Sequence, residues 1–466
     1  MGACTRAGTR TKPRGGRMSR LASAAGGIGA TRVTWRAWMV VFILLLLVTL
    51  AFIDRMSISL MVDPIKASFG IDDFRMGILQ GPAFAVFFLI GSLPMGWIVD
   101  RYPARWTIYF GVTAWSLATI ACGLAGSFTE LLIARCLVGL GEAVLQPASW
   151  SLVARLFPPQ RLALAISVLS SGAQVGAAAS YVMGGVLIAQ ATAIAADPLP
   201  VFGQVESWQV VFLACGVLGV AMAFLIFTAP RERKAGASSD GTGNAGLGRF
   251  IRDNRVFLVC HFLGFSLLCA MTYGAAAWLP TLLMRSHGLD VRTVGTLLAA
   301  VAVTAGIGGF VFNGWWVDRA FARGRKDAHL RHFALVGAAV AIIGGFGFSL
   351  GATAVALVLC FAVIQFLQPF SGVAGAVLQI ATPPEYRGRI SAAFILLYNS
   401  AGIALGPSLV VFLSDRVFAS SDLGPAIAAS YALLGSTAAA LLWAGRRHAA
   451  AAAQRGTDPA THQDSP

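Results

Sequence analysis

Long apolar segments recur along the whole of this 466-residue chain, and one of them reads VVFILLLLVTLAF over residues 40–52. A helix needs about 20 apolar residues to cross the roughly 30 Å hydrocarbon core of a bilayer. In lipid, such a run can satisfy its backbone hydrogen bonds internally only as a helix. Strands of a β-barrel would instead show alternation over about ten residues, which these segments lack. We expect twelve spanning helices, near residues 36–61, 76–99, 105–127, 129–156, 162–190, 208–229, 256–284, 292–317, 332–352, 353–381, 389–414 and 425–445.

The composition excludes a soluble protein of this length. Hydrophobic residues make up 57% of the chain and charged residues 12%, and the mean hydropathy is +0.74. A soluble domain uses about 25% charged residues, and a soluble chain of this size would cover two or three domains with polar surface. The sequence therefore predicts an all-α polytopic membrane protein of twelve transmembrane helices, which requires the lipid bilayer as its partner.

Most of the 35 Lys and Arg residues fall on one side of the membrane if the N-terminus is cytoplasmic. Cytoplasmic loops are enriched in Lys and Arg, so we expect both termini to be cytoplasmic and the protein to lie in the plasma membrane (the inner membrane of a bacterium). The net charge of +15 then reflects topology, and we expect no nucleic-acid partner. Only five basic residues fall on the outer side: Lys66, Arg75, Arg285, Arg292 and Arg416.

Two pairs of similar sequences indicate an internal repeat. GWIVDR at 96–101 is repeated as GWWVDR at 314–319, and FPPQR at 157–161 resembles TPPEYR at 382–387. Six helices per repeat give both halves the same orientation, as in transporters whose halves rock around a central site. We expect a disordered basic cytoplasmic tail (1–35), an N-terminal six-helix half (36–229), a cytoplasmic linker (230–255), a C-terminal six-helix half (256–446) and a disordered cytoplasmic tail (447–466).

The repeated hexapeptides place one acid at the cytoplasmic end of the second helix of each half. An aspartate there can accept hydrogen bonds from the free N–H groups at the start of a neighbouring helix. We expect Asp100 to reach the helix that follows Arg387, and Asp318 to reach the helix that follows Arg161, which would close the cytoplasmic side. The alternative is an ordinary turn whose arginine only follows the distribution of positive charge.

Four charged residues lie well inside the apolar spans of the first half: Asp54, Arg55, Arg135 and Glu142. Each costs about 2.5–3.5 kcal/mol or more at the bilayer centre. Arg135 and Glu142 are two helical turns apart and therefore share a face, about 10 Å apart in height, so we expect Arg135, with Arg55 as a further candidate, to act on Glu142. The four charges could form a neutral structural cluster. We favour a proton site at the acids and an anion site at the arginines, because buried ion pairs stabilise proteins poorly.

The second half carries polar but uncharged residues at comparable depth. We expect these residues to line a cavity and to contact the less polar part of an anionic substrate: Tyr273, Gln365, Tyr398 and Asn399.

At these residues the sequence resembles the major facilitator superfamily. Its loop signature is matched by Gly96, Asp100, Arg101 and Arg105, with Pro103 where the family usually has glycine, and a second copy is matched by Gly314, Asp318 and Arg319. The segments FIDRMSISLMVDPIKASFGI and RCLVGLGEAVLQPASWSLVARLFPP resemble the bacterial spinster-like branch and the proton-coupled organic-anion symporters.

The resemblance implies a secondary active, proton-coupled transporter of a small or lipid-like organic anion, expected to act as a monomer. It implies proton coupling at Glu142 and Asp54, and charge balance or substrate contact at Arg55 and Arg135. A phosphate-binding loop of an ATP-driven pump is absent, since no Gly-Lys dipeptide occurs, and we expect no enzyme activity, cofactor or metal site. A receptor or sensor that keeps the fold without transport is the alternative.

Overall fold

The computed structural model describes residues 2, 33–71, 73–80, 82–180, 205–230, 243–350, 353–419 and 422–457, and within these ranges every regular element is a helix. Nine helices of the described residues are long and apolar enough to cross a membrane. The spans predicted near 76–99, 105–127 and 129–156 are formed by shorter helices. The protein is therefore an all-α membrane protein with the predicted twelve transmembrane helices.

The first half runs from α2 to η2. Its described elements are α2 (Trp35–Leu60), α3 (Val62–Phe69), α4 (Asp73–Gln80), α5 (Pro82–Arg101), α6 (Ala104–Gly123), α7 (Phe128–Glu142), α8 (Leu145–Leu156), η1 (Pro159–Arg161), α9 (Leu162–Ser170), α11 (Ser207–Ala223) and η2 (Phe224–Thr228).

The second half follows a short helix, α12 (Gly243–Asp253), which lies within the predicted linker. Its elements are α13 (Arg255–His287), α14 (Val291–Val301), η3 (Ala302–Gly306), α15 (Ile307–Ala322), α16 (Ala328–Leu350), α17 (Ala354–Leu367), α18 (Ser371–Ala381), η4 (Pro384–Tyr386), α19 (Arg387–Phe412), η5 (Leu413–Phe418) and α20 (Gly424–Thr457).

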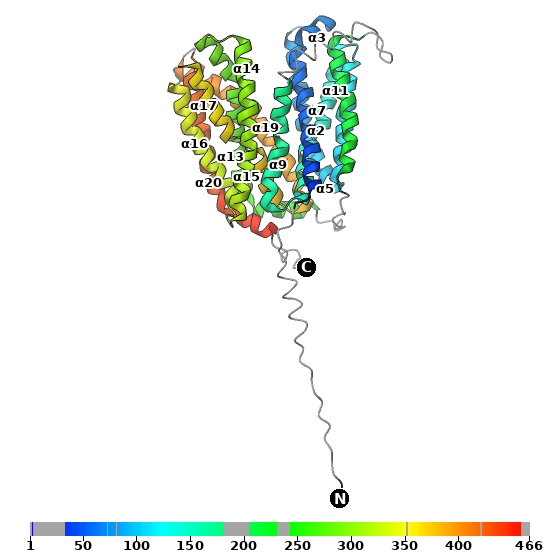
Figure 1. Ribbon diagram of the computed structural model, residues 1–466, viewed down its shortest axis with the longest axis vertical. Coiled ribbons are helices and arrows are strands. Elements are labelled where there is room, and N and C mark those ends of the chain that lie inside the picture. Colours follow the sequence, from blue (N-terminus) through cyan, green and yellow to red (C-terminus); the bar gives the residue numbers. More distant parts are fainter. Residues whose placement is uncertain are drawn as a thin grey trace.

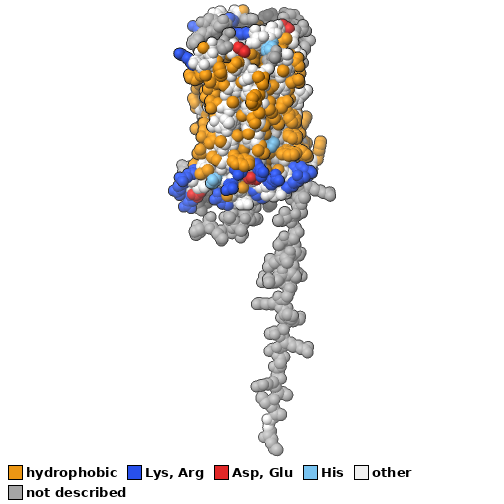
Figure 2. All heavy atoms as spheres, turned by 90° about the vertical axis from the view of Figure 1, so that its left-hand side faces the viewer, with side chains coloured by type: hydrophobic (Ala, Val, Ile, Leu, Met, Phe, Trp, Pro, Cys, Tyr) orange, Lys and Arg blue, Asp and Glu red, His pale blue; other side chains and the backbone are white. Residues whose placement is uncertain are grey.

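The two halves stand side by side, and α2 begins at the same end of the molecule at which α20 ends (Figure 1). Lys and Arg side chains gather in a band at this end, below a wall of apolar side chains (Figure 2). We call this the basic end. An apolar wall of this kind is the surface that faces lipid in a membrane protein.

Local sequence explains where several helices begin. Thr34, Ser127 and Thr353 each precede a helix, and each side-chain oxygen accepts a hydrogen bond from the backbone N–H three residues later. Such caps satisfy one of the N–H groups that a helix start leaves free. The apolar segments therefore become helices with defined ends.

Two predicted spans are broken near their middle, and they occupy equivalent places in the two repeats. The fourth span is α7 and α8, separated by Ala143 and Val144, and the tenth span is α17 and α18, separated by residues 368–370. Glu142 is the last residue of α7. Ala143 and Val144 keep right-handed helical dihedrals, so the fourth span is interrupted beside Glu142 without unwinding.

The last helix is longer than the sequence indicated. We expected the chain to be disordered from residue 447, but α20 continues to Thr457. The extension contains a run of five alanines at 449–453, and alanine has the highest helix propensity of all residues. The prediction was therefore wrong for residues 447–457, and residues 458–466 lie outside the described part of the chain.

The halves pack against each other at the basic end. Helix α5 packs on α19, and α9 packs on both α15 and α18. Glycine permits the close approach: a Cβ atom on Gly388 would lie 2.4 Å from the carbonyl oxygen of Gly96, and one on Gly314 would lie 2.7 Å from the Cα of Leu164. The structure is therefore closed at the basic end.

Candidate functional site

Two ion pairs connect α2 with α7. Nη1 of Arg135 lies 3.3 Å from Oδ2 of Asp54, and both side chains are almost fully buried. Nη2 of Arg55 lies 2.5 Å from Oε2 of Glu142. The Glu142 side chain is 2% exposed, whereas that of Arg55 is 27% exposed. Arg55 is therefore the member of the cluster that an incoming molecule can reach.

The structure selects between two arginines. We expected Arg135, with Arg55 as a further candidate, to act on Glu142; the ion-pair partner of Glu142 is Arg55, whereas that of Arg135 is Asp54. Two turns of helix separate Arg135 from Glu142 by about 10 Å, which is too far for a direct contact. The neighbours Asp54 and Arg55 therefore have different partners.

Each ion pair leaves polar atoms without a hydrogen bond. Among the described residues, no protein atom bonds Oδ1 of Asp54, Oε1 of Glu142, Nε of Arg55, or Nε and Nη2 of Arg135. A buried polar network that is only partly satisfied is costly. Such a cluster suits groups that exchange partners or protons better than it suits a purely structural role.

Aromatic rings surround the exposed arginine. The guanidinium carbon of Arg55 lies 4.4 Å from the ring centre of Phe84 and 4.9 Å from that of Phe52. A cation over the face of a ring is attracted to it. These contacts hold the guanidinium group in place independently of its ion pair with Glu142.

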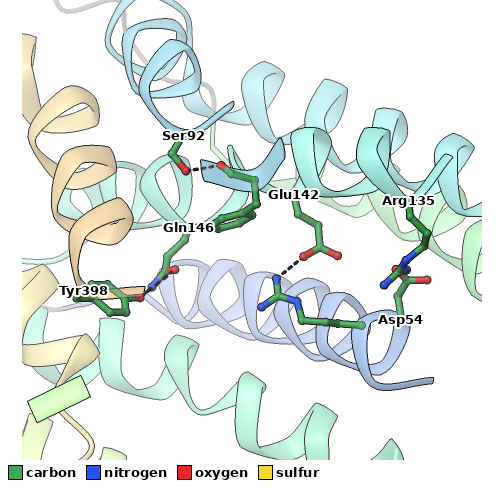
Figure 3. Close-up of polar contacts among 8 residues, drawn as sticks. Asp54, Ser92, Arg135, Glu142, Gln146 and Tyr398 are labelled. Carbon is green, nitrogen blue, oxygen red and sulfur yellow. Dashed lines mark hydrogen bonds and ion pairs between the residues drawn. The ribbon is translucent and has the colours of Figure 1, made fainter. Parts of the chain in front are cut away.

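A second polar contact crosses from the first half to the second. Nε2 of Gln146 lies 3.0 Å from the hydroxyl oxygen of Tyr398. Gln146 lies just past the break that follows Glu142. In the view of Figure 3, Glu142 lies between the Gln146–Tyr398 pair and the Asp54–Arg135 pair. The site therefore extends from buried charges in the first half to a tyrosine of the second.

The other residues predicted for the second half are less closely connected. Tyr273 is 37% exposed and lies within electrostatic range of Arg55. Asn399 donates to the carbonyl of Ile395 in its own helix, and Gln365 is half-buried. Within the described part of the chain, none of these three has a hydrogen bond to the ion pairs.

The two aspartates of the repeated hexapeptides make the hydrogen bonds that the sequence predicts. Oδ1 of Asp100 lies 2.5 Å from the N–H nitrogen of Gly388, and Oδ2 lies 3.1 Å from that of Arg389. Asp318 accepts in the same way from Ala163 at 3.0 Å and from Leu164 at 2.8 Å. Each aspartate thus joins its own half to a helix start in the other half, and we call these the Asp100 and Asp318 contacts.

The arginines near these contacts have separate partners. Arg101 and Arg319 lie over the rings of Trp97 and Trp315. Arg387 donates from Nε to the carbonyl of Thr382, which helps to fix the start of α19. Three further predicted residues lie nearby: Arg105 at the start of α6, Arg161 directly before α9, and Gly96 against α19.

Sequence reasoning missed Gln146 and Arg389. Gln146 could have been found, because it lies four residues after Glu142 and so continues one helical face. The side chain of Arg389 also contacts Asp100, since its Nε lies 3.1 Å from Oδ2. Nothing in the sequence distinguishes Arg389 from the neighbouring Arg387 as the partner of Asp100. In the residues that the structure describes, no group of three or more His, Cys, Asp or Glu could hold a metal ion.

Comparison with known proteins agrees with this architecture. An MFS-type efflux pump from Mycolicibacterium smegmatis is 27% identical over 395 residues, covering 84% of this chain and 86% of the relative. A hexuronate transporter from Bacillus subtilis is 26% identical over 392 residues, covering 81% and 88%. The crystal structure of a bacterial homologue of the human lysosomal transporter Spinster, inward-facing and unoccupied, has a TM-score of 0.55 at 23% identity, covering 90% and 98%.

A family model extends this similarity over most of the chain. The model described as the Major Facilitator Superfamily matches residues 44–407, which include both broken helices, both aspartate contacts and all four charges of the site. The predicted resemblance to this superfamily is confirmed. The chain belongs to the major facilitator superfamily.

Proposed function

We propose that this protein is a secondary active transporter that couples the movement of an organic anion to that of a proton by alternating access. The observation that carries the proposal is the contact between Arg55 and Glu142 at 2.5 Å. The carboxylate of Glu142 is paired with the guanidinium group of Arg55, which an anionic substrate would need. Protonation neutralises Glu142 and frees this guanidinium group, so the proton and the substrate bind together.

The second ion pair has a different part in this proposal. Arg135 is fully buried and held by Asp54, so it balances charge while Arg55 contacts the substrate. Asp54 is a second proton site. Carboxylates inside membrane proteins commonly form such relays. Tyr398, Tyr273, Asn399 and Gln365 belong to the second half and contact the remainder of the substrate.

We assign the basic end to the cytoplasm, because cytoplasmic loops carry the excess of Lys and Arg. The Asp100 and Asp318 contacts then close the cytoplasmic side in the described conformation. Opening to the cytoplasm requires both contacts to break. The protein works as a monomer in the bacterial inner membrane.

The substrate is a small or amphiphilic organic anion. The relatives include a hexuronate transporter and an efflux pump, and a sugar acid presents the carboxylate that Arg55 can bind through two parallel hydrogen bonds. The charged first half and the neutral polar second half fit an anionic head with a less polar remainder.

The experiment is pH-gradient-driven flux into proteoliposomes that contain the purified protein, with labelled hexuronates and anionic amphiphiles as candidate substrates. We expect uphill accumulation that collapses when an ionophore removes the gradient. Uptake of neutral or cationic compounds only would contradict the anion assignment. Binding without any flux would favour a receptor or sensor.

A further inference from the structure

A basic pocket lies at the basic end, away from the candidate transport site. It is formed where α12 turns into α13 and where α20 ends, and its volume is about 500 Å³. Three arginines and one histidine line it: Arg252, Arg255, Arg455 and His448. Asp253 is the only acid in its lining, so the pocket carries net positive charge.

Both helices that build the pocket are longer than a bilayer core. Helix α13 has 33 residues and α20 has 34, which correspond to about 50 Å each, against a hydrocarbon core of about 30 Å. The two helices pack against each other. Their ends at the basic end therefore pass the hydrocarbon region and place the pocket at the level of the lipid headgroups.

One contact fixes the geometry of the pocket. Nη2 of Arg455 donates to Oδ1 of Asn254 at 2.8 Å. Asn254 is 8% exposed and also donates to the carbonyl of Phe250 at 2.9 Å. The end of α20 is thus held against the start of α13, with the three arginines on a fixed frame.

Arg252 and Arg255 are exposed and offer their charge to a ligand, whereas Arg455 holds the frame of the pocket through Asn254. Arg252 and Asp253 approach only to 3.9 Å, with side chains 74% and 51% exposed, and an exposed pair of this kind contributes little. Arg255 has no acidic partner within 4 Å in the described part of the chain. An arginine fork matches the oxygens of a phosphate group through parallel hydrogen bonds.

An apolar strip rises from the pocket along the outer face of α13. Val256, Val259 and Leu263 are spaced three and four residues apart, which places them on one face of the helix, and all three are exposed. Arg446, one turn before the pocket on α20, lies with its guanidinium carbon 3.6 Å from the ring centre of Trp443. Tryptophan and arginine together are typical of the membrane interface.

From this arrangement we propose that the pocket binds the phosphate of an anionic phospholipid of the adjacent leaflet, with an acyl chain lying along the strip on α13. Basic pockets at the headgroup level of helix bundles are suited to such lipids. The shared chemistry is a phosphate group, and the apolar strip beside the pocket gives a lipid that carries this phosphate a surface for its acyl chain.

Native mass spectrometry of the delipidated full-length protein tests the proposal. Phosphatidylglycerol is titrated against phosphatidylcholine for the wild type and for the triple variant Arg252→Gln, Arg255→Gln, Arg455→Gln. The matched control removes three other charges from the same end, by Arg325→Gln, Lys326→Gln and Arg331→Gln. We expect the first triple variant to weaken phosphatidylglycerol binding tenfold or more and the control to change it less than twofold.

Three results would overturn the proposal. If both triple variants lost phosphatidylglycerol binding equally, the lipid would be attracted by the overall charge of the basic end and not by the pocket. Equal binding of phosphatidylcholine would remove the role of lipid charge, and displacement of lipid by glycerol phosphate at matched concentration would identify a soluble ligand. If the triple variant does not fold, a photoactivatable phosphatidylglycerol on the wild type decides the question: label in residues 252–263 or 443–455 supports the site, and label confined to other segments contradicts it.

Discussion

Gln146 and Tyr398 join the two halves of the molecule one helical turn from Glu142. The amide nitrogen of Gln146 lies 3.0 Å from the tyrosine hydroxyl, and the hydroxyl lies 3.3 Å from the amide oxygen. Tyr398 is buried and its ring packs against Phe394 and Phe370. Because α8 and α19 belong to different halves, this pair is one of the contacts that hold the two halves together in the described conformation.

Tyr398→Phe should loosen the closed state. The change removes the hydroxyl and leaves the Gln146 amide without its partner, which costs about 1–3 kcal/mol. We expect faster thiol labelling of a reporter, Ser167→Cys, which is buried between the halves, in a background whose native cysteines are replaced by alanine. Tyr431→Phe is the matched control, because the hydroxyl of Tyr431 has no partner among the described residues. Equal labelling in both variants would argue against a role for the contact.

Glu142→Gln should abolish proton-driven accumulation while substrate exchange continues. Glutamine keeps the shape of the protonated acid and cannot release a proton, so Arg55 stays available to the anion. We expect accumulation in proteoliposomes to fall to the passive ratio, with counterflow within a few-fold of the wild type. Full gradient-driven accumulation by the variant would reduce Glu142 to a structural partner of Arg55.

Asp100→Asn and Asp318→Asn should each weaken closure at the basic end. Each substitution removes the negative charge that faces the positive start of a helix, an interaction that contributes about 0.3–1 kcal/mol at exposed sites and up to about 2 kcal/mol when partly buried. We expect labelling of Ser167→Cys to rise several-fold in each variant and further in the double variant. Unchanged labelling in all three would leave only the turn interpretation.

Gly388→Ala should also open the basic end, because the added methyl group has no space there, although no charge changes. Its Cβ would lie 2.4 Å from the carbonyl oxygen of Gly96 and 2.7 Å from Oδ1 of Asp100, so α5 and α19 would have to move apart. Gly295→Ala is the control, since a Cβ there meets no atom within 4 Å. We expect the same reporter to label faster only in Gly388→Ala, and a matching increase in the control would point to general destabilisation.

Arg135→Met should destabilise the fold, because it leaves the carboxylate of Asp54 buried without its partner. Breaking one side of a buried pair costs about 3–5 kcal/mol. Adding Asp54→Asn removes the stranded charge and should restore most of the loss. Thermal unfolding of the single and double variants in detergent measures this, and a double variant no more stable than the single one would contradict the pairing.

The sequence allowed two parts of this structure to be predicted closely. The span count followed from the length of apolar segments, and the Asp100 and Asp318 contacts followed from a repeated motif near two helix starts. In both cases the relevant physics is local to a short segment, namely burial of a continuous apolar run and free N–H groups at a helix start.

The partners of the buried charges could not be predicted in the same way. Whether Glu142 meets Arg55 or Arg135 depends on the rotation and depth of α2 against α7, which no single segment specifies. The break after Glu142 was also missed, although Pro147 follows it and has no N–H to donate to the carbonyl of Ala143. The contact from Arg455 to Asn254 joins residues 201 positions apart, and it required the unexpected continuation of α20.

The donors in the Asp100 and Asp318 contacts include main-chain amides, and this determines what mutagenesis can detect. Every residue except proline carries an N–H, so replacing the side chain of Ala163 or Leu164 leaves the donor to Asp318 in place. Proline removes it, and both positions lie in the first turn of α9, where a helix tolerates proline because those N–H groups have no partner within the helix. A saturation library should therefore show a defect for proline at both positions and, at the fully buried Ala163, for bulky residues as well, whereas at Asp318 it should show one for nearly every substitution. One side of the junction between the halves therefore depends on a specific side chain. The other side depends on backbone N–H groups, which every residue except proline carries.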